Sequence, residues 1–542
     1  MSLHPLETRI DNEVASALKR ANVPYLFGIP GGGTSIDLIE ACNEVGIPFV
    51  LVQHETTAAI MAVVCGELTN SCGACISIMG PGAINLASGA GYAFWERHPL
   101  LCFTESYGLG KAPKMSIQRI DHAQMFSVFS KDSVILTNND PGKQIDDSIR
   151  LAISERPGPV HVDFPMDTSV DPEVNPEYNS VELKTSNDDL DVVANTIRNA
   201  KKPLLVVGPV VQRVGARDQL LSLAEKLQVA VMVTSKARGV ISEDHPLFVG
   251  IMSGVYQADT FEGRIVGQSD LVLAVGLDRM ELLSPWSYTQ PLITLDSIDV
   301  APDETVGTPL FTASGPIGDM LKYIENISDR RKCWDTSTIE NFWNDAMNTL
   351  GATDNTLNAA SLLHHARKIA PEDAIVSTEA GVYGRVNLYV WKVYDFETYF
   401  DSSGANTMGY SIPAALASSL VRPAQKSIAL VGDAGFLMRA SELETAARLK
   451  LSPIIIIFDD GTLGMIRIKQ RSKEYAREGV DLAQTDFVRL VESFGGIGWE
   501  VRTLEEFDIA FKKALSSDKL TVIDARLDPD VYASHIRYIR GY

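Results

Sequence analysis

Short apolar runs alternate with amphipathic stretches along most of the chain. Strand-like runs at 24–29, 49–52 and 74–79 each end in glycines or polar residues, and a helical pattern lies between the first two at 37–45. Similar apolar runs follow at 203–207, 229–234, 271–275, 428–431 and 453–458. Strands that alternate with helices predict the α/β class with doubly wound parallel sheets, and functional loops at the carboxyl ends of the strands.

The domain organisation follows from length and from a change of composition. Residues 171–189 are polar, contain prolines and lack periodicity, which is typical of a linker. The chain of 542 residues is long enough for about three domains. We predict a first domain at 1–170, a middle domain at 190–330 and, after a charged helical stretch at 324–349, a third domain at 350–542.

Composition and charge exclude some classes of partner. A net charge of −21 leaves no basic surplus for nucleic acid. We find neither an apolar run of the roughly 18 residues that a membrane span needs nor a signal sequence at the start, so a cytoplasmic protein is expected. The six cysteines do not suggest a disulfide framework, and we expect Cys72 and Cys75, although they form a CxxC, to be buried reduced thiols.

Carboxylates gather in the third domain. The apolar runs at 428–431 and 453–458 end in Gly432-Asp433-Ala434-Gly435 and Asp459-Asp460-Gly461, with a helical pattern between them at 438–450. In a right-handed β-α-β unit both tips emerge at the same edge of the sheet. Asp433 and Asp460 are then placed to share a Mg²⁺ ion, beside small residues that let backbone amides reach phosphates. The alternative is two loop carboxylates that only cap helices.

Several motifs taken together resemble a known family. Glu55 after a strand, Gly80-Pro81-Gly82 with Asn85, and the pair Asp433 and Asp460 resemble the thiamine-diphosphate enzymes of the acetohydroxyacid synthase and pyruvate decarboxylase superfamily. The resemblance covers essentially the whole chain, and the segments 403–413 and 464–466 place it nearest the acetolactate synthases. It implies three α/β domains, namely a pyrimidine-binding, a middle and a diphosphate-binding domain. It also implies thiamine diphosphate and Mg²⁺ as cofactors, 2-oxo acids or aldehydes as substrates, and a homodimer or homotetramer with active sites at the subunit interface.

The resemblance assigns roles to individual residues. Glu55 is the implied catalytic carboxylate at the pyrimidine ring nitrogen, and Gln118 is implied to act near the substrate. Asp433, Asp460 and the carbonyl of Thr462 are the implied metal ligands. The remaining implied cofactor-binding positions are Pro30, Gly31, Gly80, Asn85, Gly381, Val382, Tyr383, Asn406, Met408, Gly432, Ala434, Gly435, Leu463, Gly464 and Met465. Gly32, Gly33 and Lys469 are the further positions expected on the substrate side.

Two features depart from the family pattern, and a third, in the middle domain, concerns FAD. The usual asparagine pair is Asp459-Asp460, which adds negative charge beside a diphosphate. Lys469 stands where the biosynthetic synthases have a tryptophan that selects the acceptor. In the middle domain the first strand ends in Gly208-Pro209, and proline lacks the N–H that a phosphate needs, so FAD is expected to be absent.

The predicted activity is that of an acetolactate synthase-like carboligase or lyase. It decarboxylates a 2-oxo acid, with pyruvate as the expected donor, and transfers the acyl unit to a second carbonyl. The alternatives are a simple 2-oxo acid decarboxylase, an aldehyde or 2-hydroxyacyl-CoA lyase, and a non-catalytic cofactor-binding homologue.

Overall fold

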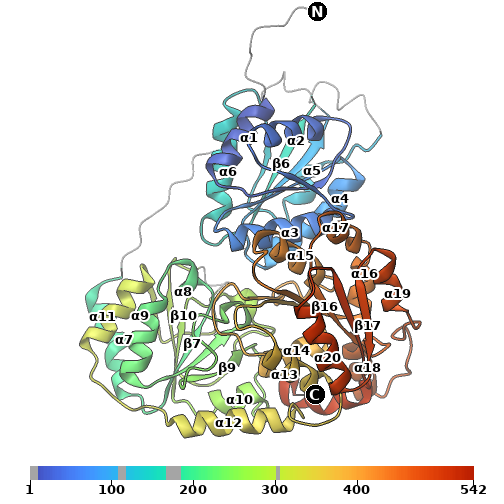
Figure 1. The fold of residues 1–542 in the computed structure, drawn as a ribbon. Helices are drawn as coiled ribbons and strands as arrows, with labels where there is room; N and C mark the ends of the chain where they lie inside the picture. Colours follow the sequence, from blue (N-terminus) through green and yellow to red (C-terminus); the bar gives the residue numbers. More distant parts are fainter. Residues whose placement is uncertain (1–9, 108–116, 167–184, 301–304, 542) are drawn as a thin grey trace, which may run out of the picture. The chain divides into compact units, whose positions relative to one another are not determined.

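The computed structural model describes residues 10–107, 117–166, 185–300 and 305–541. These residues form three six-stranded sheets with helices around them, and every strand pair with a described register is parallel (Figure 1). The predicted α/β class with three parallel sheets is confirmed. Residues 171–184 of the predicted linker lie outside the described residues, and helix α7 already begins at Asn187, within its predicted end at 189. The domain boundaries remain a prediction.

The first sheet has the strand order β2-β1-β3-β4-β6-β5. Its strands are β1 (Leu26–Ile29), β2 (Phe49–Leu51), β3 (Gly73–Ser77), β4 (Leu100–Ser106), β5 (Ser133–Ile135) and β6 (Pro159–Pro165). Its helices are α1 (Ile10–Arg20), α2 (Thr34–Glu44), α3 (Glu55–Leu68), α4 (Pro81–Trp95), α5 (His122–Phe126) and α6 (Pro141–Ile153). Helix α3 is buried on nearly all sides, as expected for a helix that is apolar all round.

The middle sheet has the order β12-β11-β10-β7-β8-β9. Its strands are β7 (Pro203–Val207), β8 (Ala230–Thr234), β9 (Phe248–Met252), β10 (Leu271–Val275), β11 (Leu292–Asp296) and β12 (Phe311–Ser314). The helices of this part are α7 (Asn187–Asn199), α8 (Val210–Arg213), α9 (Arg217–Leu227), α10 (Phe261–Val266), α11 (Ile317–Ile327) and α12 (Thr336–Thr349), with short 3-10 turns at Ser235–Ala237 and Arg279–Glu281.

The third sheet has the order β14-β13-β15-β16-β18-β17. Its strands are β13 (Ile375–Thr378), β14 (Tyr399–Phe400), β15 (Ser427–Gly432), β16 (Ile454–Asp459), β17 (Ile497–Val501) and β18 (Thr521–Arg526). The helices of this part of the chain are α13 (Ala359–Ile369), α14 (Val382–Val390), α15 (Ser411–Val421), α16 (Asp433–Arg439), α17 (Glu442–Arg448), α18 (Gly464–Ser472), α19 (Phe487–Ser493), α20 (Leu504–Leu515) and α21 (Tyr532–Arg540), and a 3-10 turn lies at Pro529–Val531.

The chain divides into two compact units, and each unit is built from stretches that are separate in the sequence. The first unit contains Met1–Tyr178, Gly409–Ser427 and Arg439–Pro453, and the second contains Asn179–Met408, Ile428–Met438 and Ile454–Tyr542. Helices α15 and α17 therefore belong to the first unit, where α15 packs against α3. The middle and third sheets share the second unit.

Two predicted helical stretches are wrong in their extent. The pattern at 438–450 is two short helices, because α16 begins at Asp433 directly after β15 and ends at Arg439 before α17 starts. The stretch at 324–349 is likewise interrupted, since α11 ends at Ile327 and Asp335 caps a new helix by accepting a bond from the Ser337 amide.

The expectation for the cysteines is confirmed. All six are free and buried, and burial raises the pKa of the Cys72 and Cys75 thiols, which keeps them protonated. No helix in the described part of the chain has both the length and the apolar character that crossing a bilayer requires.

Candidate active site

Glu55 sits at the start of a buried helix, immediately after the loop that leaves β2. The His54 imidazole caps α3 by accepting a bond from the Thr56 amide at 3.1 Å. Before it, the Gln53 amide donates to the Glu442 carboxylate of α17, at 3.2 and 3.3 Å from its two oxygens. The loop is thus held on both sides of Glu55, whose side chain is buried.

The Glu55 carboxylate is positioned by α4. Asn85 donates its side-chain amide to Glu55 Oε2 at 2.9 Å, and the Thr56 hydroxyl donates to the Asn85 carbonyl at 2.9 Å. A Cβ at Gly82 would lie 3.1 Å from Glu55 Oε1, so this position needs a small residue. The structure therefore brings Glu55, Gly82 and Asn85 together, as their grouping in the sequence led us to expect.

Gly80 and Gln118 are in direct contact. Gly80 has a φ of +67° at the start of α4, and a Cβ there would lie 2.8 Å from the Gln118 carbonyl oxygen. Both the backbone angle and the contact require glycine. The Gln118 side chain is exposed, which leaves it accessible to a substrate.

The Gly80 amide also donates to His122 Nε2 at 3.3 Å, a contact that the sequence did not reveal. Because Nε2 accepts this bond, His122 carries its proton on Nδ1, which lies 2.9 Å from Asp163 Oδ1. His122 is therefore a neutral imidazole that connects the Gly80 loop to Asp163 on β6. The signal in the sequence was weak, since His161 and Asp163 appear only as alternate polar residues in an otherwise apolar strand.

The same network continues to a second buried histidine. The Thr104 hydroxyl donates to Asp163 at 2.8 Å and therefore accepts from His161 Nε2, also at 2.8 Å. The Ser133 hydroxyl then donates to His161 Nδ1 at 2.6 Å. Burial lowers the pKa of His161 to about 4, so its imidazole is neutral at pH 7. His122, His161 and Asp163 offer three potential metal-ligand atoms within 4.8 Å of one another, but hydrogen bonds within the protein already engage these atoms.

The glycine loop after β1 is pinned by Glu105 on β4. Glu105 Oε1 accepts from the amides of Gly33 and Ser35, at 3.1 and 2.9 Å, and from the Ser35 hydroxyl at 2.5 Å. A Cβ at Gly31 would lie 2.1 Å from Glu105 Oε2, whereas nothing lies within 4 Å of a Cβ at Gly32. No motif in the sequence pointed to Glu105. Gly32 borders open space, as its expected place on the substrate side requires, and the preceding Pro30 is exposed.

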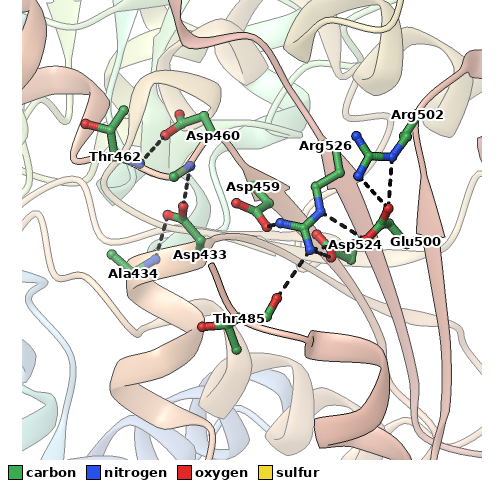
Figure 2. A network of polar contacts seen from close by, with 11 residues as sticks. Asp433, Ala434, Asp459, Asp460, Thr462, Thr485, Glu500, Arg502, Asp524 and Arg526 are labelled. Atoms are coloured by element: carbon green, nitrogen blue, oxygen red, sulfur yellow. Dashed lines mark hydrogen bonds and ion pairs between the residues drawn. The ribbon is translucent and has the colours of Figure 1, made fainter. Parts of the chain in front are cut away.

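The loops after β15 and β16 are tied together through Asp433. Its Oδ1 accepts from the Ala434 amide at 2.7 Å and its Oδ2 from the Gly461 amide at 2.8 Å (Figure 2). Asp460 accepts from the Thr462 amide at 2.9 Å. Asp433, Asp460 and Gly461 line a cavity of about 230 Å³ at this edge of the sheet.

The electrostatics of this cavity suit a hard cation. Burial is the main cause that raises the pKa of Asp433 to about 6 and that of Asp460 to about 7. The negative charge of Asp459 contributes to the shift of Asp433, and that of Asp433 contributes to the shift of Asp460. A divalent ion would stabilise the charged carboxylates that burial disfavours. The Thr462 carbonyl accepts one bond, from the Gly464 amide at 2.9 Å, and its second lone pair can bind a metal. The three predicted ligands therefore fit a magnesium ion chemically.

The glycines beside these carboxylates are explained by close packing. Tyr383 is buried, stacks on Phe458 with ring centroids 4.5 Å apart, and accepts a bond from the Gly432 amide at 2.8 Å. A Cβ at Gly381 would lie 2.4 Å from the Tyr383 ring, and one at Gly435 would lie 1.7 Å from Glu379 Oε1. Tyr383 thus holds the end of β15, while Val382, also buried, opens α14.

The remaining predicted positions lie in one loop and at helix α18, both in the second unit. Asn406, with a φ of +50°, accepts from Arg385 and donates to the Ser403 carbonyl at 3.0 Å. Met408 follows and is half-buried. At α18, the Leu463 amide donates to the Val480 carbonyl at 2.8 Å. On the same helix, a Cβ at Gly464 would approach Asp460 to 3.4 Å, Met465 packs against the core, and Lys469 is exposed.

Two loops of the middle sheet come into backbone contact at its switch point. The strand order reverses between β7 and β10, where α/β sheets usually bind nucleotides. A Cβ at Gly208 would lie 2.1 Å from the Gly276 carbonyl oxygen, so the two loops are in backbone contact there. The expectation that FAD is absent stays a prediction, and this geometry supports it.

Sequence comparisons define the class of protein. Residues 8–125 match the N-terminal TPP binding domain of thiamine pyrophosphate enzymes, residues 190–321 match the central domain, and residues 379–525 match the C-terminal TPP binding domain. The chain belongs to the thiamine pyrophosphate (thiamine diphosphate) enzyme family.

Relatives match over nearly their whole length. YdaP of Bacillus subtilis is 28% identical, over 94% of this chain and 90% of its own. The acetolactate synthase of the same organism is 26% identical, over 95% and 92%. A solved structure with the same fold is the thiamine diphosphate-dependent 4-hydroxybenzoylformate decarboxylase of Rhodococcus jostii RHA1. Its TM-score is 0.80 at 24% identity, and the match covers 96% of this chain and 99% of that one.

Proposed function

We propose that this chain is a thiamine-diphosphate- and Mg²⁺-dependent enzyme that decarboxylates a 2-oxo acid, with pyruvate as the expected donor, and transfers the acyl unit to a second carbonyl. The acetolactate synthase relative, which aligns over nearly its full length, supports this reaction. The observation that carries the proposal is that the chain holds two groups of residues, here called half-sites, each arranged to bind one end of the cofactor. Glu55 is buried and oriented by Asn85 in the first unit, and Asp433 and Asp460 flank a cavity in the second.

The residues of the two half-sites have separate tasks. Asp433, Asp460 and the Thr462 carbonyl would hold the Mg²⁺ ion that binds the diphosphate. Glu55 would share a proton with the pyrimidine ring, and because Asn85 occupies Oε2, we assign this proton to Oε1. The bound cofactor supplies the carbon nucleophile and electron sink that decarboxylation of a 2-oxo acid requires. We further propose at least a homodimer with the active site at the subunit interface, which light scattering on the purified protein tests.

Product analysis tests the reaction. Purified protein with thiamine diphosphate, Mg²⁺ and pyruvate is expected to release one carbon dioxide for each acetolactate formed from two pyruvates. Carbon dioxide with an aldehyde and without acetolactate would identify a simple decarboxylase instead. Absence of turnover with pyruvate and with a panel of 2-oxo acids and aldehydes would refute the proposed activity.

Glu55→Gln tests the role of the carboxylate. We expect turnover to fall by roughly 10²- to 10⁴-fold, which is typical for removal of a proton-transfer group, while cofactor binding persists. Glu67→Gln is the matched control, because it makes the same substitution on the same helix at a residue that contacts His98 at 3.5 Å. We expect this variant to keep wild-type turnover. Equal activity of Glu55→Gln and the wild type would contradict the assignment.

A further inference from the structure

Arg526, the last residue of β18, forms the centre of an ion-pair network beside the predicted metal ligands. β18 pairs with β16 in a register that sets Arg526 opposite Asp459, and the two side chains form an ion pair (Figure 2). The guanidinium also contacts Asp524 at 2.8 Å, Glu500 at 3.2 Å and the Thr485 carbonyl at 3.2 Å. Its side chain is 15% exposed, so these contacts are largely shielded from solvent.

The charges around the cavity are unequal. Acidic groups outnumber basic ones, with carboxylates at Asp433, Asp459, Asp460, Asp524 and Glu500 and guanidiniums only at Arg526 and Arg502 among the residues of this network. Arg502 is 63% exposed and contacts only Glu500 in the network, whereas Arg526 lines the same cavity as Asp433 and Asp460. Arg526 is thus the cation that bonds directly to the carboxylate adjacent to Asp460.

Asp433 and Asp460 have different hydrogen-bond partners from Asp459. In Figure 2, the hydrogen bonds that Asp433 and Asp460 accept all come from backbone amides, so neutral donors orient their oxygens. Asp459 is 7% exposed and is engaged by a guanidinium. Without that cation, its buried charge would act on any anion bound in the cavity, because Coulomb forces are weakly screened in such sites.

We propose that Arg526 is a positioning residue of the cation and diphosphate site. It binds Asp459 so that Asp433 and Asp460 alone present carboxylates to the cation, and it cancels the charge that Asp459 would set against the diphosphate. The inference rests on the cofactor part of the proposed function. It explains how this chain accommodates a second aspartate next to Asp460.

Binding measurements on cofactor-free protein test this role without any turnover assay. We compare Arg526→Gln, Asp459→Asn and the double variant by titration with thiamine diphosphate at saturating Mg²⁺, and separately with Mg²⁺ alone. Arg526→Gln is expected to weaken thiamine diphosphate binding about tenfold, as one uncompensated charge nearby implies. Binding of Mg²⁺ alone should not weaken, because the added negative charge attracts the ion. The double variant should regain wild-type affinity for thiamine diphosphate to within about threefold.

The control is Arg502→Gln, which removes a cation from the exposed rim of the network and should leave both affinities within about twofold of the wild type. The inference is overturned if Arg526→Gln binds thiamine diphosphate as the wild type does, or if adding Asp459→Asn does not restore the affinity of Arg526→Gln. It is also overturned if Arg526→Gln weakens binding of Mg²⁺ alone as much as binding of thiamine diphosphate, because an equal loss indicates structural damage.

Should Arg526→Gln not fold by circular dichroism, Asp459→Asn alone decides. It is expected to bind thiamine diphosphate several-fold more tightly, because Arg526 then adds net positive charge, and unchanged affinity overturns the inference. A wild-type chain that binds no thiamine diphosphate would instead refute the proposed function itself.

Discussion

Acidification is expected to loosen the first sheet through His161. This side chain is fully buried, accepts from Ser133 and donates to Thr104, and stacks on Phe126 with ring centroids 4.1 Å apart. Its pKa is lowered to about 4, chiefly by burial; the charge of Asp163 opposes this shift and the nearby His122 contributes to it. When β6 opens, the imidazole regains an ordinary pKa of about 6.5.

The sign and size of the effect follow from linkage. Because the folded pKa is depressed, the opened state binds the proton first, so stability is fully present above pH 6.5 and is lost as the pH falls toward 4. The full difference of about 2.5 units corresponds to about 3 kcal/mol, of which about 2 kcal/mol is lost at pH 5. The loss applies to openings that expose His161 to water.

Hydrogen exchange followed by mass spectrometry on peptides that cover β6 measures this opening. After correction for intrinsic exchange rates, wild-type protection should fall between pH 7 and pH 5 by about 2 kcal/mol more than that of His161→Gln. His245→Gln serves as a matched control, because His245 is partly exposed beside Glu225 of α9 and lies outside the first sheet. Equal pH dependence in the wild type and His161→Gln would refute the reasoning.

Further substitutions test strand β1 and the glycine loop that follows it. Gly28→Ala should destabilise the protein by about 1–3 kcal/mol, because its Cβ would lie 2.0 Å from the Ile76 carbonyl oxygen, and a lower thermal midpoint measures this. Gly32→Ala, with open space around its Cβ, should keep the wild-type midpoint, and equal losses in both variants would contradict the packing argument. Glu105→Ala removes the acceptor of the Ser35 amide and hydroxyl, so it should raise KM for the 2-oxo acid more than it lowers kcat. Glu105→Gln keeps an acceptor oxygen and should have a smaller effect, whereas identical kinetics of these two variants would count against a pinning role.

The local pattern of the sequence was sufficient to locate most strands. The predicted run at 203–207 coincides with β7 and the run at 271–275 with β10, because a strand buried on both faces is a short apolar segment regardless of its partners. The helical stretch at 438–450 contains α17 but was wrong in its extent, since a first helix already begins at Asp433 directly after β15. Local periodicity does not distinguish a loop aspartate from the first residue of a helix.

The sequence by itself determined the class of fold, the family resemblance and the two carboxylates at the ends of β15 and β16. These features depend on order along the chain, and parallel strands bring their carboxyl ends to one edge. Only the tertiary structure decided which side chains support them. Thr104 forms a hydrogen bond with Asp163, 59 residues further along the chain, because β4 lies beside β6. Arg526 likewise bonds to Asp459, 67 residues before it, because β16 lies beside β18. Strand order and register fix such partners, and neither is written in the spacing of polar and apolar residues.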